Sequence, residues 1–214
     1  MIIKMVYEGG NAEIVEKKSR FIASVFPVHS EQEALDFIAS VRKKYWDASH
    51  NCSAFVVGQR PELARCSDDG EPQGTAGRPM LDVLLGEEMH DTLVVVTRYF
   101  GGTLLGTGGL VRAYSAAVQA GLRASKVIEK QDGFLLTIRT DYNGIGKIQY
   151  LLGQRQLAIT NSTYTDIVEI ETLVPAGKVD ELISAITEGT SGRAAFPSKE
   201  PVMFAFLDGE PLLL

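Results

Sequence analysis

Residues 98–112 read RYFGGTLLGTGGLVR, and this stretch says more about the fold than any other part of the chain. It begins where the apolar run 93–96 ends, and it continues into a helix-like segment, 110–124. Glycine is favoured where the backbone turns tightly or approaches a ligand closely. The free amides at a helix start form a ready anion site. We therefore expect a strand, a tight loop and a helix that begins near Leu110, with a phosphate-like group held at the loop.

The candidate anion-binding residues of this stretch are two arginines and five glycines: Arg98, Arg112, Gly101, Gly102, Gly106, Gly108 and Gly109. Arginine can bind phosphate or carboxylate through two parallel hydrogen bonds. The stretch lacks both the Gly-Lys-Ser/Thr ending of a phosphate loop and a full Gly-x-Gly-x-x-Gly, which argues against a nucleotide hydrolase or a Rossmann domain. A purely structural role, in which the glycines only make a tight connection, stays open.

A second candidate is the acidic loop that precedes the predicted helix 75–85. Its three carboxylates, Asp68, Asp69 and Glu71, could bind a divalent cation or orient the hydroxyls and amines of a partner. They could also bond their own backbone, as in Asx turns. Because a buried unpaired charge is costly, we predict that Asp69 or Glu71 pairs with Arg98 or Arg112. We expect neither a metal nor a cofactor, and we add nearby Arg78 to the binding candidates.

A third candidate is the segment around His50 and Cys52, just before the apolar run 54–57. The two side chains share one face of a strand because they lie two residues apart. Cysteine beside histidine could be a nucleophile pair, but Cys52 leads into a core strand, so we expect a buried, inert thiol. His50 is kept as a binding residue. We expect Trp46, beside Tyr45, to pack in the core or at a domain edge rather than to stack on bases.

Composition is that of an ordinary globular protein, with 45% hydrophobic and 22% charged residues among 214. No apolar run approaches the roughly 18 residues that span a bilayer, and the start lacks the features of a signal peptide. We expect no membrane contact. Two cysteines are too few for a disulfide framework and are not spaced as a metal site, so we expect free thiols and a cytoplasmic location.

Charge is distributed unevenly along the chain. The net charge is −6, which argues against a generic nucleic-acid binder. Residues 1–130 hold 15 basic and 16 acidic side chains, whereas residues 131–214 hold 6 and 11. We therefore expect any anionic partner to contact the first part of the chain. We also predict that the exposed sheet face within 134–207 does not bind RNA.

The first part of the chain alternates strands and helices. Ser30 followed by Glu33 resembles a capping box, and the basic run 42–44 suits the end of the helix that would begin there. A polar loop is expected over 59–73. The other predicted elements are a strand 19–28, a strand 54–57, a helix 75–85, a strand 92–97 and a helix 110–124.

A break between two parts of the chain is predicted near 129–133, and the pattern of strands and helices differs after it. The predicted elements are a strand 134–138, a helix 142–152, strands 158–165 and 167–174 that pair, a helix 176–187 and a strand 202–206. This βαββαβ order is the ferredoxin-like arrangement. We therefore predict an α+β protein with two domains, residues 1–131 and residues 132–214.

The motifs together resemble the IMPACT family, and its bacterial YigZ-like members in particular. The resemblance rests on three features: the loop residues 68–71, the pair His50-Asn51, and a spaced series of residues that leads to Arg98-Tyr99-Phe100-Gly101-Gly102 and Gly106. The series consists of Gly77, Met80, Leu81, Leu84, Met89, Val95 and Val96. It covers residues 15–125 strongly. The remainder is similar to the small C-terminal domain of bacterial members.

The resemblance implies a fold for each domain. The first would have the left-handed βαβ type of fold found in the second domain of a small-subunit ribosomal protein and in galactokinase–mevalonate kinase-type kinases. The second would be ferredoxin-like, similar to the last domain of elongation factor G. The resemblance also implies a role, since eukaryotic members regulate translation by relieving inhibition from a starvation-responsive kinase. For bacterial members, association with nucleic acid or the ribosome is the usual suggestion. No catalytic residues are carried over, because the family has no established set.

Three functions stay open. The first is a non-catalytic, cytoplasmic, translation-linked regulator that binds RNA or a ribosome-associated partner through the glycine, arginine and acidic-loop residues, with no DNA-specific contact. The second is an enzyme acting on a small phosphorylated or peptide-like substrate with Asp69, Glu71 and His50. The third is a protein–protein adaptor. A deep cleft with a perturbed carboxylate would favour the enzyme. A shallow basic groove would favour nucleic acid or a protein surface.

Overall fold

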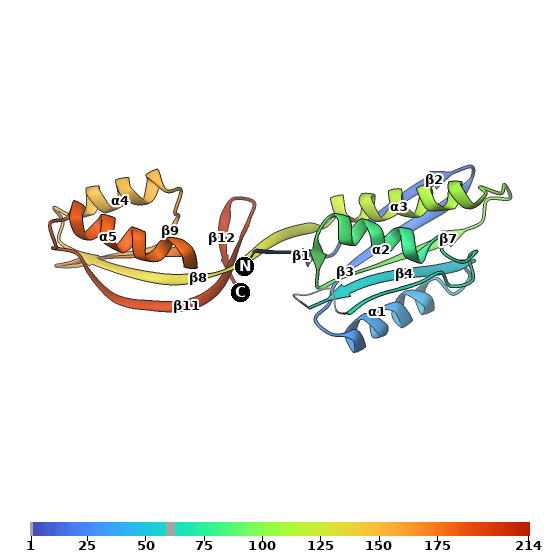
Figure 1. Cartoon of the computed structure of the whole chain (residues 1–214), viewed down its shortest axis with the longest axis horizontal. Coiled ribbons are helices and arrows are strands. Elements are labelled where there is room, and N and C mark those ends of the chain that lie inside the picture. The colour runs from blue at the N-terminus through green and yellow to red at the C-terminus, as the bar shows by residue number, and fades with distance from the viewer. Residues whose placement is uncertain (1, 59–62) are drawn as a thin grey trace. The chain divides into compact units, whose positions relative to one another are not determined.

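The computed structural model describes residues 2–58 and 63–214, which divide into two compact units (Figure 1). The N-terminal unit comprises residues 3–128, and the C-terminal unit comprises residues 129–214 together with Ile2. Both units combine helices with β-sheet, and parallel and antiparallel strand pairs both occur. The chain is therefore a two-domain α+β protein with mixed sheets. No helix among the described residues is long and apolar enough to cross a membrane.

The N-terminal unit is built on a five-stranded antiparallel sheet. Its strand order is β2 (Asn11–Glu16), β3 (Ser19–Pro27), β7 (Thr92–Tyr99), β4 (His50–Val57) and β5 (Leu63–Ser67). Outside this five-stranded sheet, β1 (Ile2–Glu8) pairs in parallel with β6 (Met89–His90). The central strands β7 and β4 are buried along almost their whole length, which explains their near-continuous apolar sequence.

Helices cover both faces of this sheet (Figure 1). One face packs against α1 (Glu31–Lys44), and the other packs against α2 (Gly77–Gly86) and α3 (Thr107–Arg123). Two hydrophobic cores result, one on each side of the sheet. Successive strand residues point to opposite faces, so Val94 and Val96 of β7 enter the α2–α3 core, whereas Leu93 and Val95 enter the α1 core.

The predicted start of α1 is confirmed in detail. The Ser30 hydroxyl accepts a hydrogen bond from the Glu33 amide at 3.1 Å, which satisfies one of the free amides of the first turn. The Glu33 carboxylate accepts a second bond from the amide of His29 at 2.7 Å. In an ideal capping box this second bond comes from the cap residue itself. At the other end, residues 42–44 complement the helix dipole.

The strand directions bring the important loops together at one end of the N-terminal unit. Arg20 near the start of β3 pairs with Tyr99 at the end of β7, and Arg98 pairs with His50 at the start of β4. The turn between β2 and β3, the connection from α1 to β4 and the loop from β7 to α3 therefore lie at this end (Figure 1). The opposite end holds the start of α1 and the segment between α2 and β7.

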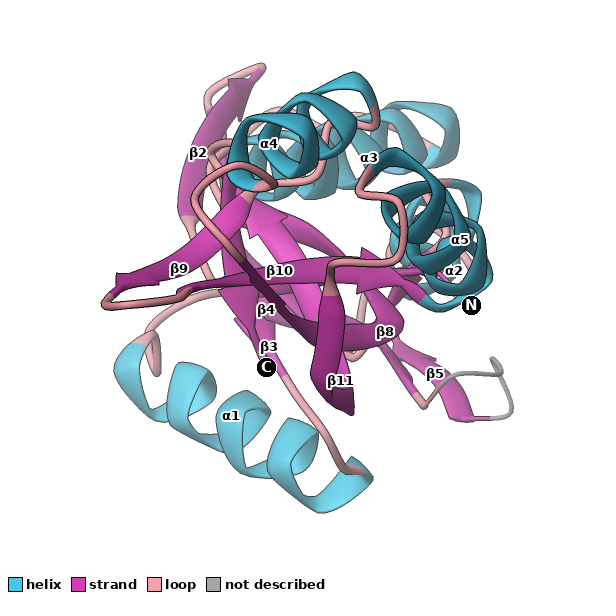
Figure 2. Ribbon diagram, turned by 90° about the vertical axis from the view of Figure 1, so that its left-hand side faces the viewer, coloured by secondary structure: helices cyan, strands magenta, loops and turns pink. Residues whose placement is uncertain are grey.

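The C-terminal unit has the predicted βαββαβ order. It runs through β8 (Lys126–Thr140), α4 (Ile145–Gln154), β9 (Ile159–Tyr164), β10 (Val168–Pro175), a short 3-10 helix η1 (Ala176–Lys178), α5 (Val179–Gly189) and β11 (Ala195–Leu207), with β12 (Glu210–Leu213) added. In the sheet β12 pairs with β11, β11 with β8, β8 with β10, and β10 with β9. The helices α4 and α5 pack on one face (Figure 2). The predicted pairing of the two middle strands, β9 and β10, is confirmed.

Several expected element boundaries differ from the structure. The break predicted near 129–133 does not interrupt the chain, since it lies inside the continuous strand β8, but the division between the two units falls beside it, between residues 128 and 129. Gly133 is not a turn there: a side chain at this position would meet the Phe204 ring at 2.4 Å, so the glycine makes room for β11. The polar loop 59–73 contains β5, and α3 begins at Thr107 rather than near Leu110. Residues 59–62 of that loop lie outside the described residues. The strands β1, β2 and β12 were not predicted, because each is short or half-exposed.

Candidate functional site

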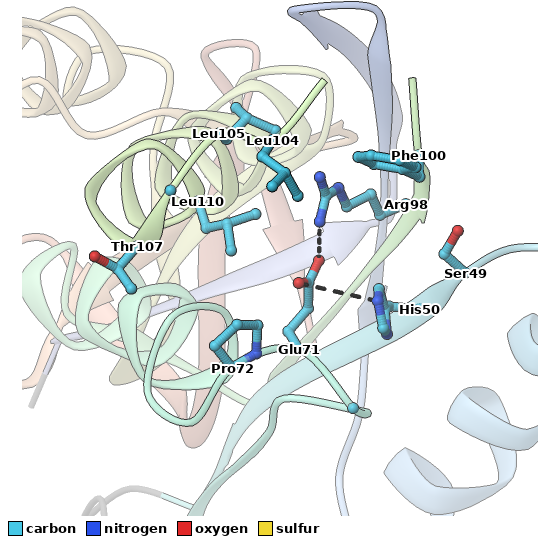
Figure 3. A pocket seen from close by; sticks show the side chains of 12 residues that line it. Ser49, His50, Glu71, Pro72, Arg98, Phe100, Leu104, Leu105, Thr107 and Leu110 are labelled. Atoms are coloured by element: carbon cyan, nitrogen blue, oxygen red, sulfur yellow. Dashed lines mark hydrogen bonds and ion pairs between the residues drawn. The ribbon is translucent and has the colours of Figure 1, made fainter. Parts of the chain in front are cut away.

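A pocket of about 540 Å³ opens at the end of the N-terminal unit where the loops meet (Figure 3). Its walls are mostly apolar and come from the loop after β7 and the first turn of α3: Phe100, Leu104, Leu105 and Leu110, with Pro72 from the acidic loop. Its floor is polar and consists of Glu71, Arg98 and His50. Segments that are far apart in the sequence thus contribute to one cavity.

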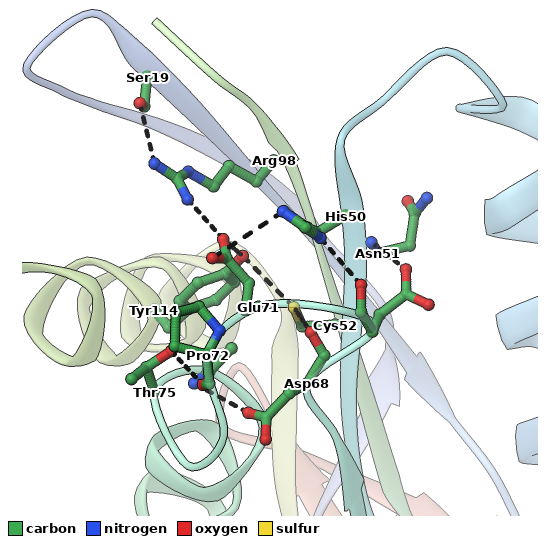
Figure 4. A network of polar contacts seen from close by, with 12 residues as sticks. Ser19, His50, Asn51, Cys52, Asp68, Glu71, Pro72, Thr75, Arg98 and Tyr114 are labelled. Atoms are coloured by element: carbon green, nitrogen blue, oxygen red, sulfur yellow. Dashed lines mark hydrogen bonds and ion pairs between the residues drawn. The ribbon is translucent and has the colours of Figure 1, made fainter. Parts of the chain in front are cut away.

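A buried ion pair forms the centre of the floor (Figure 4). Arg98 Nη1 donates to Glu71 Oε1 at 2.6 Å, and the two side chains are only 7% and 3% exposed. The buried hydroxyl of Tyr114, from α3, donates to the same oxygen at 2.8 Å. The guanidinium carbon also lies 5.3 Å from the ring centre of Phe21 and 5.6 Å from that of Phe100. The predicted pairing of Glu71 with Arg98 is therefore confirmed.

His50 is oriented by the acidic loop. Its Nδ1 lies 2.9 Å from the carbonyl oxygen of Asp69, which can only accept, so Nδ1 is the nitrogen that carries hydrogen. Its Nε2 lies 3.9 Å from Glu71 Oε2, too far for a direct hydrogen bond. Two atoms that do not bond each other, His50 Nε2 and Glu71 Oε2, therefore lie side by side at the pocket floor.

The two aspartates of the loop hold its shape. Asp68 accepts hydrogen bonds from the amides of Gly74, Ala76 and Gly77 at 2.8, 3.1 and 2.8 Å. Burial tends to raise the pKa of Asp68, but these amides outweigh it and hold the pKa below its ordinary value. Asp69 pairs with Arg42 at 2.6 Å, and its other oxygen accepts from the amide of Asn51. Asp69 thus pairs with neither of the arginines that were expected.

The arginines separate into groups. Arg78 pairs with Asp82 on the exposed side of α2 at 2.8 Å and does not line the pocket. Arg112 does not line it either. It lies beside Gly109 and Lys17 in a smaller neighbouring hollow of about 250 Å³. Arg78, Arg98 and Arg112 therefore do not line one cavity in the described part of the chain, and their predicted binding of an anion stays a prediction.

Glycines of the loop differ in what surrounds them. Gly101 packs against the backbone of Lys18, and its amide donates to the Ser19 hydroxyl at 3.1 Å. Gly102 and Gly106 have positive φ angles of 83° and 73°, which suit glycine. Only Gly106 of the predicted loop glycines lines the large pocket; Gly108 and Gly109 belong to the first turn of α3.

Three residues that complete the site were not among the sequence-based candidates. Tyr114 is the one aromatic residue of the helix-like segment 110–124, a signal that could have marked it. Ser19 is fully buried and lies 3.4 Å from Arg98 Nη2. Phe100 belongs to the stretch 98–112, but its place in the pocket wall was not predicted. Among the described residues, no three histidine, cysteine, aspartate or glutamate side chains are arranged to hold a metal ion.

The expected inert role of Cys52 fits its surroundings. The thiol is buried, and its sulfur lies 2.9 Å from the carbonyl oxygen of Asp68 and 3.3 Å from the Tyr114 hydroxyl oxygen, so its single hydrogen can be donated to either acceptor. Burial raises the pKa of Cys52 to about 12, so thiolate is scarce at neutral pH. Burial also raises the pKa of the Tyr114 hydroxyl well above its usual range.

We expect one fast-reacting thiol in the folded protein. Cys66 is exposed on β5 and should react with a disulfide reagent such as dithionitrobenzoate, whereas Cys52 should react only when the N-terminal unit opens. A Cys66→Ser variant should lose the fast phase, and a Cys52→Ser variant should keep it. Two fast phases in the native protein would contradict the buried position of Cys52.

Exposed basic side chains gather around the pocket end. Lys17 and Lys18 form the β2–β3 turn, Lys43 and Lys44 end α1, and Arg112 follows the loop; none of them has a carboxylate partner within the described part of the chain. We call these five residues the basic end. Trp46 lies just beyond α1 and is 82% exposed, so the expected packing of this side chain is wrong. The opposite end of the unit carries Glu31, Glu33, Glu87, Glu88 and Asp91.

Comparison with known proteins identifies both parts of the chain. Residues 17–122 match the Impact N-terminal domain, and residues 138–193 match a domain of unknown function, DUF1949. The IMPACT family member YvyE of Bacillus subtilis is 43% identical over 189 residues, which cover 88% of this chain and 87% of YvyE. The IMPACT family member YigZ of Escherichia coli is 40% identical, with 82% and 87% covered.

A solved structure supports the architecture. The crystal structure of a hypothetical protein superposes with a TM-score of 0.58 at 36% identity and covers 91% of this chain and 96% of its own. The matched N-terminal domain contains the whole pocket floor: His50, Glu71 and Arg98. The similarity to each bacterial relative extends over most of both chains. The chain therefore belongs to the IMPACT family.

Proposed function

We propose that this protein is a translation-linked regulator that binds single-stranded RNA through the basic end and Trp46. The observation that carries this proposal is that five cations without a carboxylate partner among the described residues lie at the end of the unit that also carries Trp46, which is 82% exposed. The link to translation rests on the family resemblance, since eukaryotic IMPACT members regulate translation. Free RNA and ribosomal RNA would both bind to this same surface, the basic end with Trp46.

Electrostatics supports a phosphate-bearing partner at this end. Non-specific affinity for nucleic acid comes mainly from cations that neutralise phosphates. Elsewhere at this end the cations are already compensated: Arg20 pairs with Glu13, Arg42 with Asp69, and Arg98 with Glu71. Lys17, Lys18, Lys43, Lys44 and Arg112 have no such partner among the described residues. Two acidic side chains at this end, Glu16 and Asp47, have no ion pair there either and offset part of this positive charge.

Trp46 supports a single strand in particular. An aromatic side chain that lies open to solvent can stack on an unpaired base of any sequence. Replacing such an aromatic side chain by alanine typically costs about 1–3 kcal/mol of binding free energy for each stacked base. Lys43 and Lys44 lie just before Trp46 in the chain, so phosphates flanking a stacked base would find cations within a few residues.

We propose that the C-terminal unit does not bind RNA, because its acidic charge opposes phosphate. Residues 131–214 hold 11 acidic and 6 basic side chains, and the ion pair Arg139–Glu169 occupies neighbouring strands of the sheet. We propose that this unit is ferredoxin-like, as its βαββαβ order and strand neighbours suggest. We propose for the N-terminal unit the left-handed βαβ type of fold of the small-subunit ribosomal protein domain.

Binding rather than catalysis is the proposed activity, and the cytoplasm is the proposed location. The candidate carboxylate of an enzyme, Glu71, is held by Arg98 and Tyr114 and serves as the partner of a buried charge. Two free cysteines are compatible with a reducing compartment.

The test is the salt dependence of RNA binding by the full chain. A labelled oligouridylate should bind the wild type with an affinity that falls steeply with salt. A variant with all five basic-end residues changed to Gln should bind at least about tenfold more weakly, and its log–log salt slope should be shallower by about 0.7 for each phosphate that is no longer neutralised. Trp46→Ala should lose roughly 1–3 kcal/mol of binding free energy with little change in slope.

The matched control lies in the C-terminal unit. Lys147 and Lys178 are exposed, and changing both to Gln should leave RNA affinity and slope unchanged. A loss per removed charge that is as large in this control as in the basic-end variant would mean that binding follows net charge alone. Capture of a ribosomal protein without RNA dependence, combined with no effect of the basic-end changes, would favour the adaptor function instead.

A further inference from the structure

We propose that the large pocket of the N-terminal unit is a separate binding site for an uncharged organic ligand that carries an N–H donor group on an apolar body. This inference goes beyond RNA binding, because it concerns the cavity floored by His50, Glu71 and Arg98 and not the basic end. The two sites use different residues, so each can fail while the other stands.

The apolar body is indicated by the walls. Leu104 is 82% exposed and Phe100 is 49% exposed, although both are large apolar side chains beside a cavity of about 540 Å³. Leu105 and Leu110 continue the same apolar wall along the start of α3 (Figure 3). Pockets of this size, with apolar walls and a few convergent polar groups, are typical of small-molecule sites.

A hydrogen-bond donor on the ligand is indicated by the floor. Glu71 Oε2 and His50 Nε2 lie 3.9 Å apart without bonding each other, and the Nδ1 bond to Asp69 leaves Nε2 as an acceptor in the neutral ring. One ligand nitrogen can lie about 2.9 Å from both atoms. A primary amide nitrogen has two hydrogens and can donate to each of them.

The charge of the floor favours a neutral ligand. Glu71 already has its counter-charge in Arg98 at 2.6 Å. A ligand cation would therefore lie near the guanidinium without a free carboxylate to balance it, and a ligand anion would face Glu71 Oε2. Both would bury a charge without a partner, which is costly.

Arg98 adds little for a ligand to bind. It lines the pocket, but its side chain is only 7% exposed, and its Nε, although it has no hydrogen-bond partner within the described residues, is buried. The floor therefore selects a ligand by the donor that the ligand offers to Glu71 and His50.

The test compares three probes with the same ring and different charge. Benzamide, benzoate and benzamidine are titrated into the full chain with labelled leucine methyl groups, and the resonances of Leu104, Leu105 and Leu110 are followed. We expect benzamide to shift these methyls and to bind at least about tenfold more tightly than either charged probe, since each of those buries an unbalanced charge. Leu104→Ala should weaken benzamide binding roughly threefold or more, because it removes apolar surface from the wall.

Leu35 on α1 supplies the matched control, because it is 47% exposed and lies on the helix that covers the other sheet face. Leu35→Ala should leave benzamide binding unchanged, and Leu104→Ala should leave RNA affinity unchanged. The proposal is overturned if no probe shifts the three methyls, if benzoate or benzamidine binds as tightly as benzamide, or if Leu35→Ala weakens benzamide binding as much as Leu104→Ala does.

Discussion

Glu71→Ala is expected to destabilise the N-terminal unit by about 3–5 kcal/mol, because it leaves the buried guanidinium of Arg98 without its counter-charge. The carboxylate is 3% exposed and Arg98 is 7% exposed, so water cannot easily replace it. The Tyr114 hydroxyl loses its acceptor at the same time. Hydrogen exchange of the amides in β4 and β7 measures the loss in the free energy of unfolding of the N-terminal unit. These amides report on that unit separately from the C-terminal one.

Two further variants separate the ion pair from simple truncation. Changing Glu71 and Arg98 together to apolar residues, Glu71→Leu with Arg98→Met, should recover a large part of the lost stability, since no unpaired charge then remains in the core. Asp82→Ala removes a carboxylate of an exposed pair with Arg78 on α2 and should cost about 0.5 kcal/mol or less. A loss for Glu71→Ala no larger than that of Asp82→Ala would show that the floor of the pocket is solvated.

Gly101→Ala is expected to cost about 3 kcal/mol, because the new methyl group has no room. It would lie 2.1 Å from the carbonyl carbon of Lys18 and 2.2 Å from its oxygen. These are backbone atoms of the β2–β3 turn and cannot move aside as a flexible side chain can. The hydrogen bond from the Gly101 amide to Ser19, next to Arg98, would be disturbed as well. Thermal melting together with exchange of the β3 amides measures the effect.

Two neighbouring glycines are the matched controls. Gly102→Ala has open space around the new methyl group but a φ of 83°, so it should cost about 1 kcal/mol through backbone strain alone. Gly108 lies in the first turn of α3, where a methyl group would meet only the end of Arg112 at 3.7 Å; Gly108→Ala should be neutral or stabilise the helix by up to about 1 kcal/mol. If Gly101→Ala melted like the wild type but bound RNA less well, Gly101 would be a ligand contact instead of a packing residue.

Local sequence signals predicted most of the regular structure. Ser30 and Glu33 marked the start of α1 because capping depends on residues three positions apart. The apolar run in β7 and the spaced apolar residues of α5 identified a buried strand and an amphipathic helix, because these periods are set by the backbone itself. Boundaries were less accurate where a glycine served packing: Gly133 looked like a break, yet it accommodates the Phe204 ring of β11.

For the site, the sequence determined by itself which residue types were available: an acidic loop, a histidine at a strand start, and arginines on either side of a glycine loop. It also led to the prediction that a carboxylate of the loop pairs with one of the arginines, since an unpaired charge at a packed strand end is unfavourable. Only the tertiary structure decided which partners meet. Glu71 meets Arg98 and Tyr114, Asp69 meets Arg42, and Arg112 lies in a different hollow. The reason is physical: the pairing of β4 with β7 and the packing of α3 on the sheet fix distances between segments that are far apart in the chain, and no local period encodes those distances.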